Sequence, residues 1–322
     1  MRAVKLLQSL VVCAAVSGTA LAQTFPAKPI TIIVPFPPGG VTDPVARQVG
    51  QRMAENVKQP VIVENKPGAS GIIAAEFVKK QPADGYTVLF GFTGSHAVNP
   101  SLYTKLPYDP QKDFQPVTLI INSPHILVVP ADSPAKSVAD LVALAKSKPG
   151  GLTFASQGIG AGGHLLGEMF KAQTKTNLSH VPYKGSAPAL TDMLAGRVDL
   201  FFDALVTSLP YVRDGKLRAL AIANKTRSKL LPDVPTMADA GFPGIEMDQW
   251  FGMLVPAGTP PAVVQRLNQE FIKAVRSPDI EKSLTERGLD VVTTTPEQFA
   301  AIIKADSATL GKVVRDSGAK AD

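Results

Sequence analysis

Three loops rich in glycine and hydroxyl side chains carry the residue types best suited to chemistry with a small anion. Each loop follows a short apolar run and precedes a segment with helical periodicity. Backbone N–H groups at the start of a helix are unpaired and carry about half a positive charge, so they bind carboxylate or phosphate without a lysine. These loops therefore indicate anion capture; they span residues 35–44, 91–100 and 155–164.

The loop at residues 35–44 reads PFPPGGVTDP. Prolines stiffen it, and the paired glycines Gly39 and Gly40 allow the backbone to approach a ligand closely. Asp43 is placed to cap a helix that has Pro44 at its first position. We expect an anion at this helix start; the alternative is a rigid turn that serves only the fold.

The loop at residues 155–164, ASQGIGAGGH, matches G-x-G-x-x-G through Gly158, Gly160 and Gly163. A dinucleotide site also needs an acidic residue about 20 positions further on, at the end of a strand. The segment at that distance reads SHVPYK and contains no acid. We therefore exclude nucleotide binding and expect the helix start after this loop to bind an anion.

Hydroxyl side chains in two of these loops would add hydrogen-bond donors to an anion site. Ser156 lies in the loop just described, and Thr93 and Ser95 lie in the loop at residues 91–100, directly after the run YTVLF. For Thr93 and Ser95, an ordinary capped turn is an equally good interpretation.

The sequence contains none of the usual catalytic or metal-binding constellations. Ser95 and His96 are neighbours in sequence, and adjacent side chains rarely face one another, so we do not interpret them as a catalytic pair. Ser156 has Phe154 where a nucleophile elbow requires glycine. We expect no enzymatic activity, no metal and no cofactor, since the four histidines are scattered without metal-ligand spacing: His96, His125, His164 and His180.

The elements that position these loops are expected to form an α/β protein with two lobes. Short β-branched runs alternate with helical segments, a pattern that builds open, mostly parallel sheets covered on both faces. A second series of strands begins near Pro124, and an extended run near Trp250 precedes two helices that start at Thr259-Pro260 and Thr295-Pro296. We predict that these helices return to the first lobe. Two crossings then form a hinge with a cleft, between lobe 1 (residues 23–123 and 251–322) and lobe 2 (residues 124–250).

The first 22 residues are interpreted as a secretory signal peptide. A basic head precedes an apolar run that ends in Ala20-Leu21-Ala22, typical of cleavage after Ala22. The apolar run is shorter than the roughly 20 residues that span a bilayer. The sole cysteine, Cys13, would leave with this segment, so residues 23–322 contain no thiol. We therefore expect a soluble protein of the periplasm.

The charge balance of the mature chain is modestly positive. Loss of Arg2 and Lys5 with the signal leaves 31 basic and 27 acidic residues, a formal charge of +4. The basic residues are scattered and form no run long enough for a nucleic-acid arm, so we expect no nucleic acid as a partner. The surplus suits an anionic ligand without requiring one. We expect a monomer.

The whole mature chain resembles the Bug family of periplasmic solute receptors, the TctC-like binding components of tripartite tricarboxylate transporters. The resemblance rests on four segments and their spacing: PFPPGGVTD at 35–43, VENKPGASG at 63–71, ADGYT at 83–87 and HVPYKG at 180–185. It implies a type II Venus-flytrap fold, with two α/β lobes. It also implies binding of a small carboxylate (a di- or tricarboxylate, an amino acid or an aromatic acid) through main-chain amides and hydroxyls, often with bridging waters.

The resemblance also implies which residues contact the ligand. In lobe 1 these are Gly40, Val41, Thr42, Asp43, Gly68, Ala69, Thr93 and Ser95. In lobe 2 they are Ser156, Gly162, Gly163, His164 and Asp203. Many relatives have serine where Gly162 or Gly163 stands, so amide N–H donors would have to replace a hydroxyl contact here.

Asp203, which follows the run VDLFF, is the position that could select the ligand. Its carboxylate would repel a second carboxylate but would accept a hydrogen bond from an ammonium or hydroxyl group. The hypothesis is that Asp203 favours amino or hydroxy acids over simple dicarboxylates. The alternative is a solvated aspartate at a strand end.

Hinge closure over the captured carboxylate is the mechanism that we expect. The closed form would dock on the membrane permease of a tripartite tricarboxylate transporter, or it would be presented to the ectodomain of a sensor kinase. The sequence leaves both partners open. A third alternative, an exported hydrolase or isomerase, would require turnover of the bound ligand.

Overall fold

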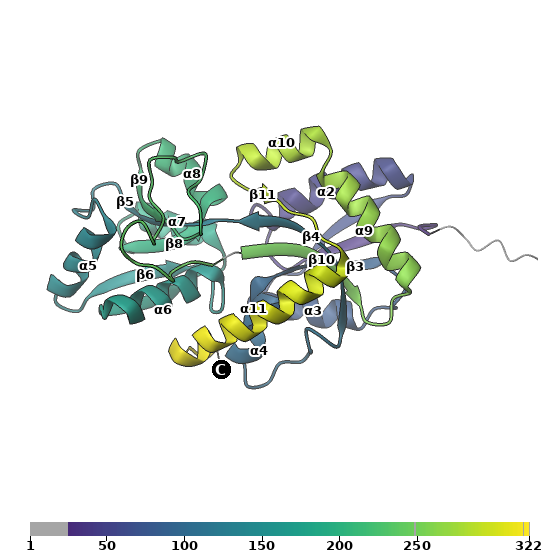
Figure 1. The fold of residues 1–322 in the computed structure, drawn as a ribbon, viewed down its shortest axis with the longest axis horizontal. Helices are drawn as coiled ribbons and strands as arrows, with labels where there is room; N and C mark the ends of the chain where they lie inside the picture. Colours follow the sequence, from purple (N-terminus) through teal and green to yellow (C-terminus); the bar gives the residue numbers. More distant parts are fainter. Residues whose placement is uncertain (1–24, 248, 318, 322) are drawn as a thin grey trace, which may run out of the picture.

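The computed structural model describes residues 25–247, 249–317 and 319–321. The predicted signal peptide, residues 1–22, lies outside the described residues. Two lobes are visible in Figure 1, each built on its own sheet and joined through extended segments in the middle of the molecule.

The first sheet has six strands in the order β11-β4-β10-β3-β1-β2. Their bounds are β1 Ile30–Val34, β2 Val61–Asn65, β3 Thr87–Phe92, β4 Phe114–Ser123, β10 Gln249–Pro256 and β11 Asp290–Val291. β1 runs parallel to β2 and β3, whereas β10 runs antiparallel to β3 and β4. Almost every side chain of β1 and β10 is buried, as expected for strands covered on both faces.

The second sheet has five strands in the order β7-β6-β8-β5-β9. Their bounds are β5 His125–Pro130, β6 Leu152–Ser156, β7 Leu178–Pro182, β8 Leu200–Ala204 and β9 Leu217–Ile222. β6 runs parallel to β7 and β8, whereas β5 runs antiparallel to β8 and β9.

Both sheets are mixed, although most strands of each run in one direction, as expected: β10 and β11 are reversed in the first sheet and β5 in the second. Two of the three reversed strands lie at the passages between the lobes: β5 begins the second lobe after β4, and β10 leads back beside β4. A strand that leaves a lobe and one that returns beside it must run in opposite directions. Repeated strand–helix units do not have this constraint and supply the parallel pairs.

The two crossings lie side by side. β4 ends at Ser123 and β5 begins at His125, with Pro124 between them. β10 begins at Gln249, which is paired with Ser123 in the antiparallel ladder. The predicted crossings near residues 124 and 250 thus coincide with the passages between the two sheets, while the lobe boundaries given above stay a prediction.

Helices begin directly after several of these strands. Four of them start close to the crossings: α2 Thr42–Val57, α6 Gly162–Thr174, α7 Ser186–Leu194 and α8 Leu205–Arg213. The others are α3 Ile72–Lys79, α4 Asn99–Leu102, α5 Val138–Ser147, α9 Pro261–Val275, α10 Pro278–Glu286 and α11 Pro296–Ser317, with a 3₁₀ turn η1 Ala69–Gly71 and a π turn η2 Gly94–Val98. None of the helices in the described residues combines the length and the apolar character needed to cross a membrane.

The C-terminal helices pack mainly on the first sheet. α9 lies against α2 and β4, and α11 lies against η2, α4 and β4 and also reaches α6 of the other lobe (Figure 1). The indole Nε1 of Trp250 donates to Asp306 Oδ2 at 2.7 Å, which attaches α11 to the start of β10. α11 therefore contacts both lobes beside the crossings.

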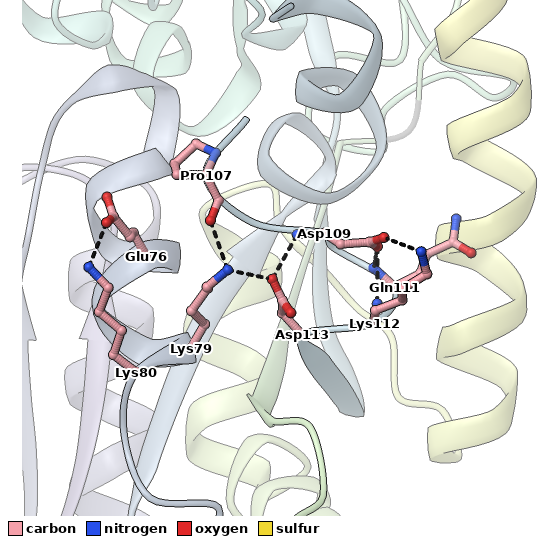
Figure 2. Close-up of polar contacts among 8 residues, drawn as sticks. All are labelled: Glu76, Lys79, Lys80, Pro107, Asp109, Gln111, Lys112 and Asp113. Atoms are coloured by element: carbon pink, nitrogen blue, oxygen red, sulfur yellow. Dashed lines mark hydrogen bonds and ion pairs between the residues drawn. The ribbon is translucent and has the colours of Figure 1, made fainter. Parts of the chain in front are cut away.

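A polar clamp holds the long segment between α4 and β4 against α3, as Figure 2 shows. Lys79 Nζ donates to Pro107 O and to Asp113 Oδ2, both at 2.8 Å. Asp113 Oδ2 also accepts from the backbone N–H of Asp109 at 2.8 Å, and the Asp109 carboxylate accepts from Gln111 N at 2.9 Å. The clamp lies outside the cavity described below and gives this segment one defined course into β4.

Candidate binding site between the lobes

A cavity of about 500 Å³ lies between the lobes, beside the two crossings. Lobe 1 lines it with the loop at residues 36–42 and with Phe92 and Phe251. Lobe 2 lines it with the residues that precede or begin α6, α7 and α8. Its polar lining side chains are Thr42, Ser123, His125, Gln157, Lys184, Ser186, Thr207, Tyr211, Gln249 and Arg287.

The lobe 1 side, here called the α2 wall, consists of residues 36–42 and the start of α2. No described side chain caps the first turn of α2. The prediction of Asp43 as N-cap is wrong, because Val41 already has helical dihedral angles and the helix begins at Thr42. Asp43 Oδ1 instead forms an ion pair with Arg47 Nη2 at 2.9 Å, so its charge is compensated. The first N–H groups of α2 are left to a ligand.

A second helix start, that of α6, faces the cavity from lobe 2. α6 begins at Gly162 without a cap from Ala161, and its second residue, Gly163, donates its N–H to Gln157 Oε1 at 3.2 Å. A Cβ on Gly162 would lie 2.6 Å from both the His125 ring and Met247 Cε, and one on Gly163 would lie 2.4 Å from Phe202 O. Glycine at these positions therefore lets the helix start approach the crossing strand β5 at His125 and strand β8 at Phe202. A serine at either position would require its neighbours to shift.

The floor of the cavity, defined as Ser123, His125 and Gln249, carries polar atoms that lack a hydrogen-bond partner among the described residues. These atoms are Ser123 Oγ, His125 Nδ1 and Gln249 Oε1, and the three residues are 0%, 2% and 7% exposed. Thr42 Oγ1 in the α2 wall is also buried and also lacks a hydrogen-bond partner among the described residues. An unpaired buried polar group costs about 1–3 kcal/mol, so these atoms favour a polar ligand. Burial lowers the pKa of His125 to about 4, which keeps the ring neutral at pH 7.

The floor residues are not among those predicted from the sequence to bind the ligand. A signal was present, because polar residues flank Pro124 and precede Trp250, where two apolar strands meet the crossings. Their convergence could not be read from the sequence, since Ser123 and Gln249 are 126 positions apart and are joined only by the β4–β10 ladder.

The opposite side of the cavity, here called the Asp203 wall, is organised by one buried carboxylate at the end of β8. Asp203 is 0% exposed and lies behind the lining residues. Its Oδ1 accepts from Gln157 Nε2 at 3.0 Å and from Ser186 Oγ at 2.6 Å. Its Oδ2 accepts from the hydroxyls of Thr207 and Ser208, each at 2.6 Å. Gln157, Ser186 and Thr207 line the cavity, so Asp203 acts on it through them.

Two effects oppose one another in setting the charge of Asp203. Burial is the larger effect and raises the pKa of the carboxyl above its usual value, although the four hydrogen bonds from Ser186, Ser208, Thr207 and Gln157 lower it. We assign the carboxylate form, because the three hydroxyl oxygens at 2.6 Å have the short spacing of hydroxyl–carboxylate bonds. The start of α8, one residue beyond the Ala204 cap, lies close by and favours a negative charge there.

Two cationic side chains also line the cavity. Lys184 is exposed and Arg287 is half-buried, and neither forms an ion pair within the described part of the chain. In that same part, no group of three or more His, Cys, Asp or Glu side chains is arranged to hold a metal ion.

The predicted ligand-binding residues fall into two groups. Gly40, Val41, Thr42 and Gly162 line the cavity. The others lie behind the lining or away from it: Asp43, Gly68, Ala69, Thr93, Ser95, Ser156, Gly163, His164 and Asp203.

Thr93 and Ser95 use their hydroxyls inside lobe 1. Thr93 Oγ1 accepts from Trp250 N at 3.0 Å. Ser95 Oγ donates to Phe92 O at 3.0 Å and lies 2.8 Å from His96 Nδ1. The statement that Ser95 and His96 do not face one another is wrong, because the π turn η2 brings them together. Burial lowers the pKa of His96 to about 3, and the pair lies outside the cavity lining.

Ser156 and His164 both contact the ring of His180, at the first turn of α6. Ser156 Oγ lies 2.6 Å from His180 Nε2, and the rings of His164 and His180 stack with centroids 4.2 Å apart. His164 Nδ1 accepts from Gly160 N at 3.1 Å, which fixes the glycine loop ahead of α6. These side chains support the helix start that faces the cavity.

The turn containing Gly68 and Ala69 is exposed and contacts the other lobe. Ser70 Oγ donates to Ile159 O at 2.5 Å. Four successive residues, 68–71, have positive φ, including Ala69 at 45° and Ser70 at 50°, an unfavourable conformation for side chains with a Cβ. This turn therefore joins lobe 1 to the glycine loop of lobe 2 at the edge of the site.

Comparisons with known proteins agree with this architecture. The model of the tripartite tricarboxylate transporter family receptor matches residues 45–319. Three similar solved structures are R. palustris Rpa4515 with adipate (39% identity, 91% of this chain and 98% of that chain, TM-score 0.87), the periplasmic binding protein BugD (33%, 92% and 99%, 0.86), and MatC from Rhodopseudomonas palustris with bound malate (34%, 90% and 100%, 0.84).

These matches confirm the two-lobed α/β periplasmic-binding fold and the family resemblance predicted from the sequence. They extend over nearly the whole chain, including both sheets and both crossings. The chain belongs to the tripartite tricarboxylate transporter receptor family, the Bug or TctC group of periplasmic solute-binding proteins.

Proposed function

We propose that this chain is an extracytoplasmic receptor that captures a small carboxylate between its lobes for a tripartite tricarboxylate-type transporter. One observation carries the proposal: at a single cavity, the uncapped start of α2 and the start of α6 at Gly162 meet floor atoms that have no partner in the described chain. Helix N-termini favour a carboxylate, and the unpaired floor groups gain hydrogen bonds when a polar ligand binds.

The proposed ligand is a di- or tricarboxylate, an amino acid or an aromatic acid. Adipate is named with Rpa4515 and malate with MatC, and both are small acids with two carboxyl groups. The cavity volume of about 500 Å³ suits a ligand of this size. Gly40, Val41, Thr42 and Gly162 are the proposed main-chain contacts, and the floor residues are proposed as additional contacts.

Closure of the two lobes is the proposed mechanism. The carboxylate first meets the α2 wall, and lobe 2 then brings the start of α6 over it. The differential contact made in the closed form shifts the equilibrium toward closure. The paired crossings at Ser123 and Gln249 are the proposed hinge. A permease in the membrane would then recognise the closed form.

Binding without turnover is part of the proposal. The two hydroxyl–imidazole contacts, Ser95–His96 and Ser156–His180, lie outside the cavity lining, and the lining histidine, His125, is neutral. After overnight incubation with the protein, the bound acid should be recovered unchanged in its NMR spectrum. A new product that depends on the protein would contradict this part of the proposal.

A ligand screen tests the receptor function. Residues 23–322 should be melted in the presence of carboxylic acids, amino acids and aromatic acids, with the neutral amides of the same acids as controls. A ligand at 100 times its Kd adds about 2.7 kcal/mol to the stability of the folded state, enough for a clear rise in Tm. Stabilisation by one or a few acids, but not by their amides, is expected. Stabilisation by neutral sugars alone would overturn the proposal.

Closure can be measured with a fluorophore pair, because residues 23–322 contain no native cysteine. Lys146→Cys on α5 and Gln269→Cys on α9 place the labels on exposed sites in opposite lobes (Figure 1). Energy transfer should rise when a binding acid is added. A control pair within lobe 1, Gln111→Cys with Gln269→Cys, should show no change.

A further inference from the structure

The polar side-chain hydrogens of Ser186, Thr207 and Gln157 in the Asp203 wall are all committed inside the protein. Ser186 has one hydroxyl hydrogen, and it is donated to Asp203 Oδ1. Thr207 also has one, which reaches Asp203 Oδ2 at 2.6 Å or Ala204 O at 2.8 Å. Gln157 uses both amide hydrogens, on Asp203 Oδ1 and Phe202 O, and its Oε1 accepts from Gly163 N. A hydroxyl whose hydrogen is committed offers only lone pairs to a ligand.

Ser186 and Thr207 therefore face the cavity as acceptors, with a buried negative charge directly behind them. All four side chains that bind Asp203 are neutral, so no cation among them cancels this charge. The carboxylate of the α2 wall is held differently, since Asp43 is paired with the cation Arg47 and the wall presents main-chain N–H donors. A second carboxylate placed against Ser186 and Thr207 would meet lone pairs and a like charge.

We propose that Asp203 is a positioning residue that holds Ser186 and Thr207 as acceptors, so that the preferred ligand is a carboxylic acid carrying a hydroxyl or ammonium donor toward these two oxygens. The inference rests on the proposed function and names the class of acid. It also changes the role expected for Asp203, which acts through the two hydroxyls and does not touch the ligand.

Matched acids that differ by one donor group test the proposal. Calorimetric titration of residues 23–322 should compare succinate with malate and aspartate, adipate with 2-hydroxyadipate and 2-aminoadipate, and benzoate with 4-hydroxybenzoate. Within any set that binds, the best donor-bearing acid should bind at least about tenfold more tightly than its parent, since the parent leaves the acceptors unpaired. A parent acid that binds equally well or better would overturn the proposal, because water or another group would then supply the hydrogen.

Substitution of Asp203 separates its positioning role from a purely structural one. In Asp203→Asn the amide must donate, so a neighbouring hydroxyl has to accept and turn its own hydrogen elsewhere. The affinity ratio between donor-bearing and parent acid should fall to within about threefold. Asp199→Asn is the matched control: this aspartate precedes the other end of β8, binds Thr153 and Lys148, and lies outside the cavity lining. The affinity ratio between donor-bearing and parent acid should be the same in Asp199→Asn as in the wild type, whatever the Tm of the variant.

Two further variants test the same proposal if Asp203→Asn does not fold. Ser186→Ala and Thr207→Val each delete one acceptor and should each lower the same ratio. An unchanged ratio in all folded variants of the Asp203 wall would sink the inference while leaving the receptor function intact. Failure of every acid to bind the wild type would instead overturn the proposed function, and the inference with it.

Discussion

The two walls of the cavity treat a buried carboxylate in opposite ways. In the α2 wall, Asp43 lies in the first turn of the helix and is neutralised by Arg47 at 2.9 Å. In the Asp203 wall, the carboxylate has four neutral donors and no cation among its partners. The first arrangement leaves main-chain donors toward the cavity, and the second leaves side-chain acceptors.

Because of this difference, one site can combine general recognition of carboxylates with selection among them. Main-chain N–H groups at a helix start attract any carboxylate, because their charge does not depend on a side-chain rotamer. A hydroxyl group that donates its hydrogen to a buried carboxylate can only accept a hydrogen bond from a ligand. It therefore distinguishes ligands that carry a donor hydrogen at that point from ligands that do not. The floor between the walls adds neutral groups at the crossings.

Loss of Asp203 should produce the largest effect on stability. Asp203→Ala leaves the buried hydroxyl of Ser208 and the half-buried donors of Gln157, Ser186 and Thr207 without their acceptor, which we expect to cost about 3–5 kcal/mol in the free energy of unfolding. Urea denaturation measures this value. Asp199→Ala should cost clearly less, because its carboxylate is partly exposed. If the two variants were equally stable, the Asp203 network would not be the organising feature of its wall.

The floor should give the stability a pH dependence. Burial depresses the pKa of His125 from 6.5 to about 4, so the folded state prefers the neutral ring. The unfolded state then binds more protons below pH 6.5, and stability is lost as pH falls toward 4. At about 1.4 kcal/mol per pKa unit, His125 should account for roughly 2–3 kcal/mol between pH 7 and pH 4.5.

Urea titrations at these two pH values, for the wild type and His125→Gln, measure that contribution. The variant should lose less stability on acidification than the wild type. His96→Gln serves as a comparison away from the cavity, since burial lowers the pKa of His96 to about 3. Parallel pH profiles for wild type and His125→Gln would show that His125 is not held neutral by folding.

Removal of the compensating cation should weaken the α2 wall modestly. Arg47→Met leaves the Asp43 charge unpaired near the helix start, and carboxylate affinity should fall about two- to fivefold at low salt. Arg266→Met is the matched control, because Arg266 forms an i,i+4 pair with Glu270 on α9, away from the cavity. Affinities are measured by calorimetry at 20 mM and 500 mM salt. An equal loss in both variants would mean that long-range charge, not the α2 wall, is responsible.

The polar clamp of Figure 2 should have the smallest effect and none on binding. Lys79→Met removes the contacts to Pro107 O and Asp113, and we expect a loss of about 1 kcal/mol in the free energy of unfolding. Affinity for any bound acid should remain at the wild-type value. A change in affinity would mean that this segment is coupled to the lobes' closure.

Much of the scaffold could be predicted from local patterns. Strand–helix alternation predicts two α/β units, and Pro124 and Trp250 mark the passages between them. The loop at residues 35–44 correctly predicted the helix start at the cavity, although the helix begins at Thr42 and not after Asp43. The mixed sheets could not be predicted, because strand direction at the crossings depends on which segments return beside one another.

The sequence by itself determined the chemistry that is available: glycine-rich helix starts, few cations near them, and no thiol in residues 23–322. These properties follow from residue type and local spacing, so they need no knowledge of distant contacts. Which groups lie together at the cavity depends on the fold. It placed Asp203 behind Ser186 and Thr207, brought Ser95 against His96, and joined Ser123 to Gln249. The physical reason is that hydrogen-bond polarity and burial depend on partners far apart in the chain, which the fold alone brings together.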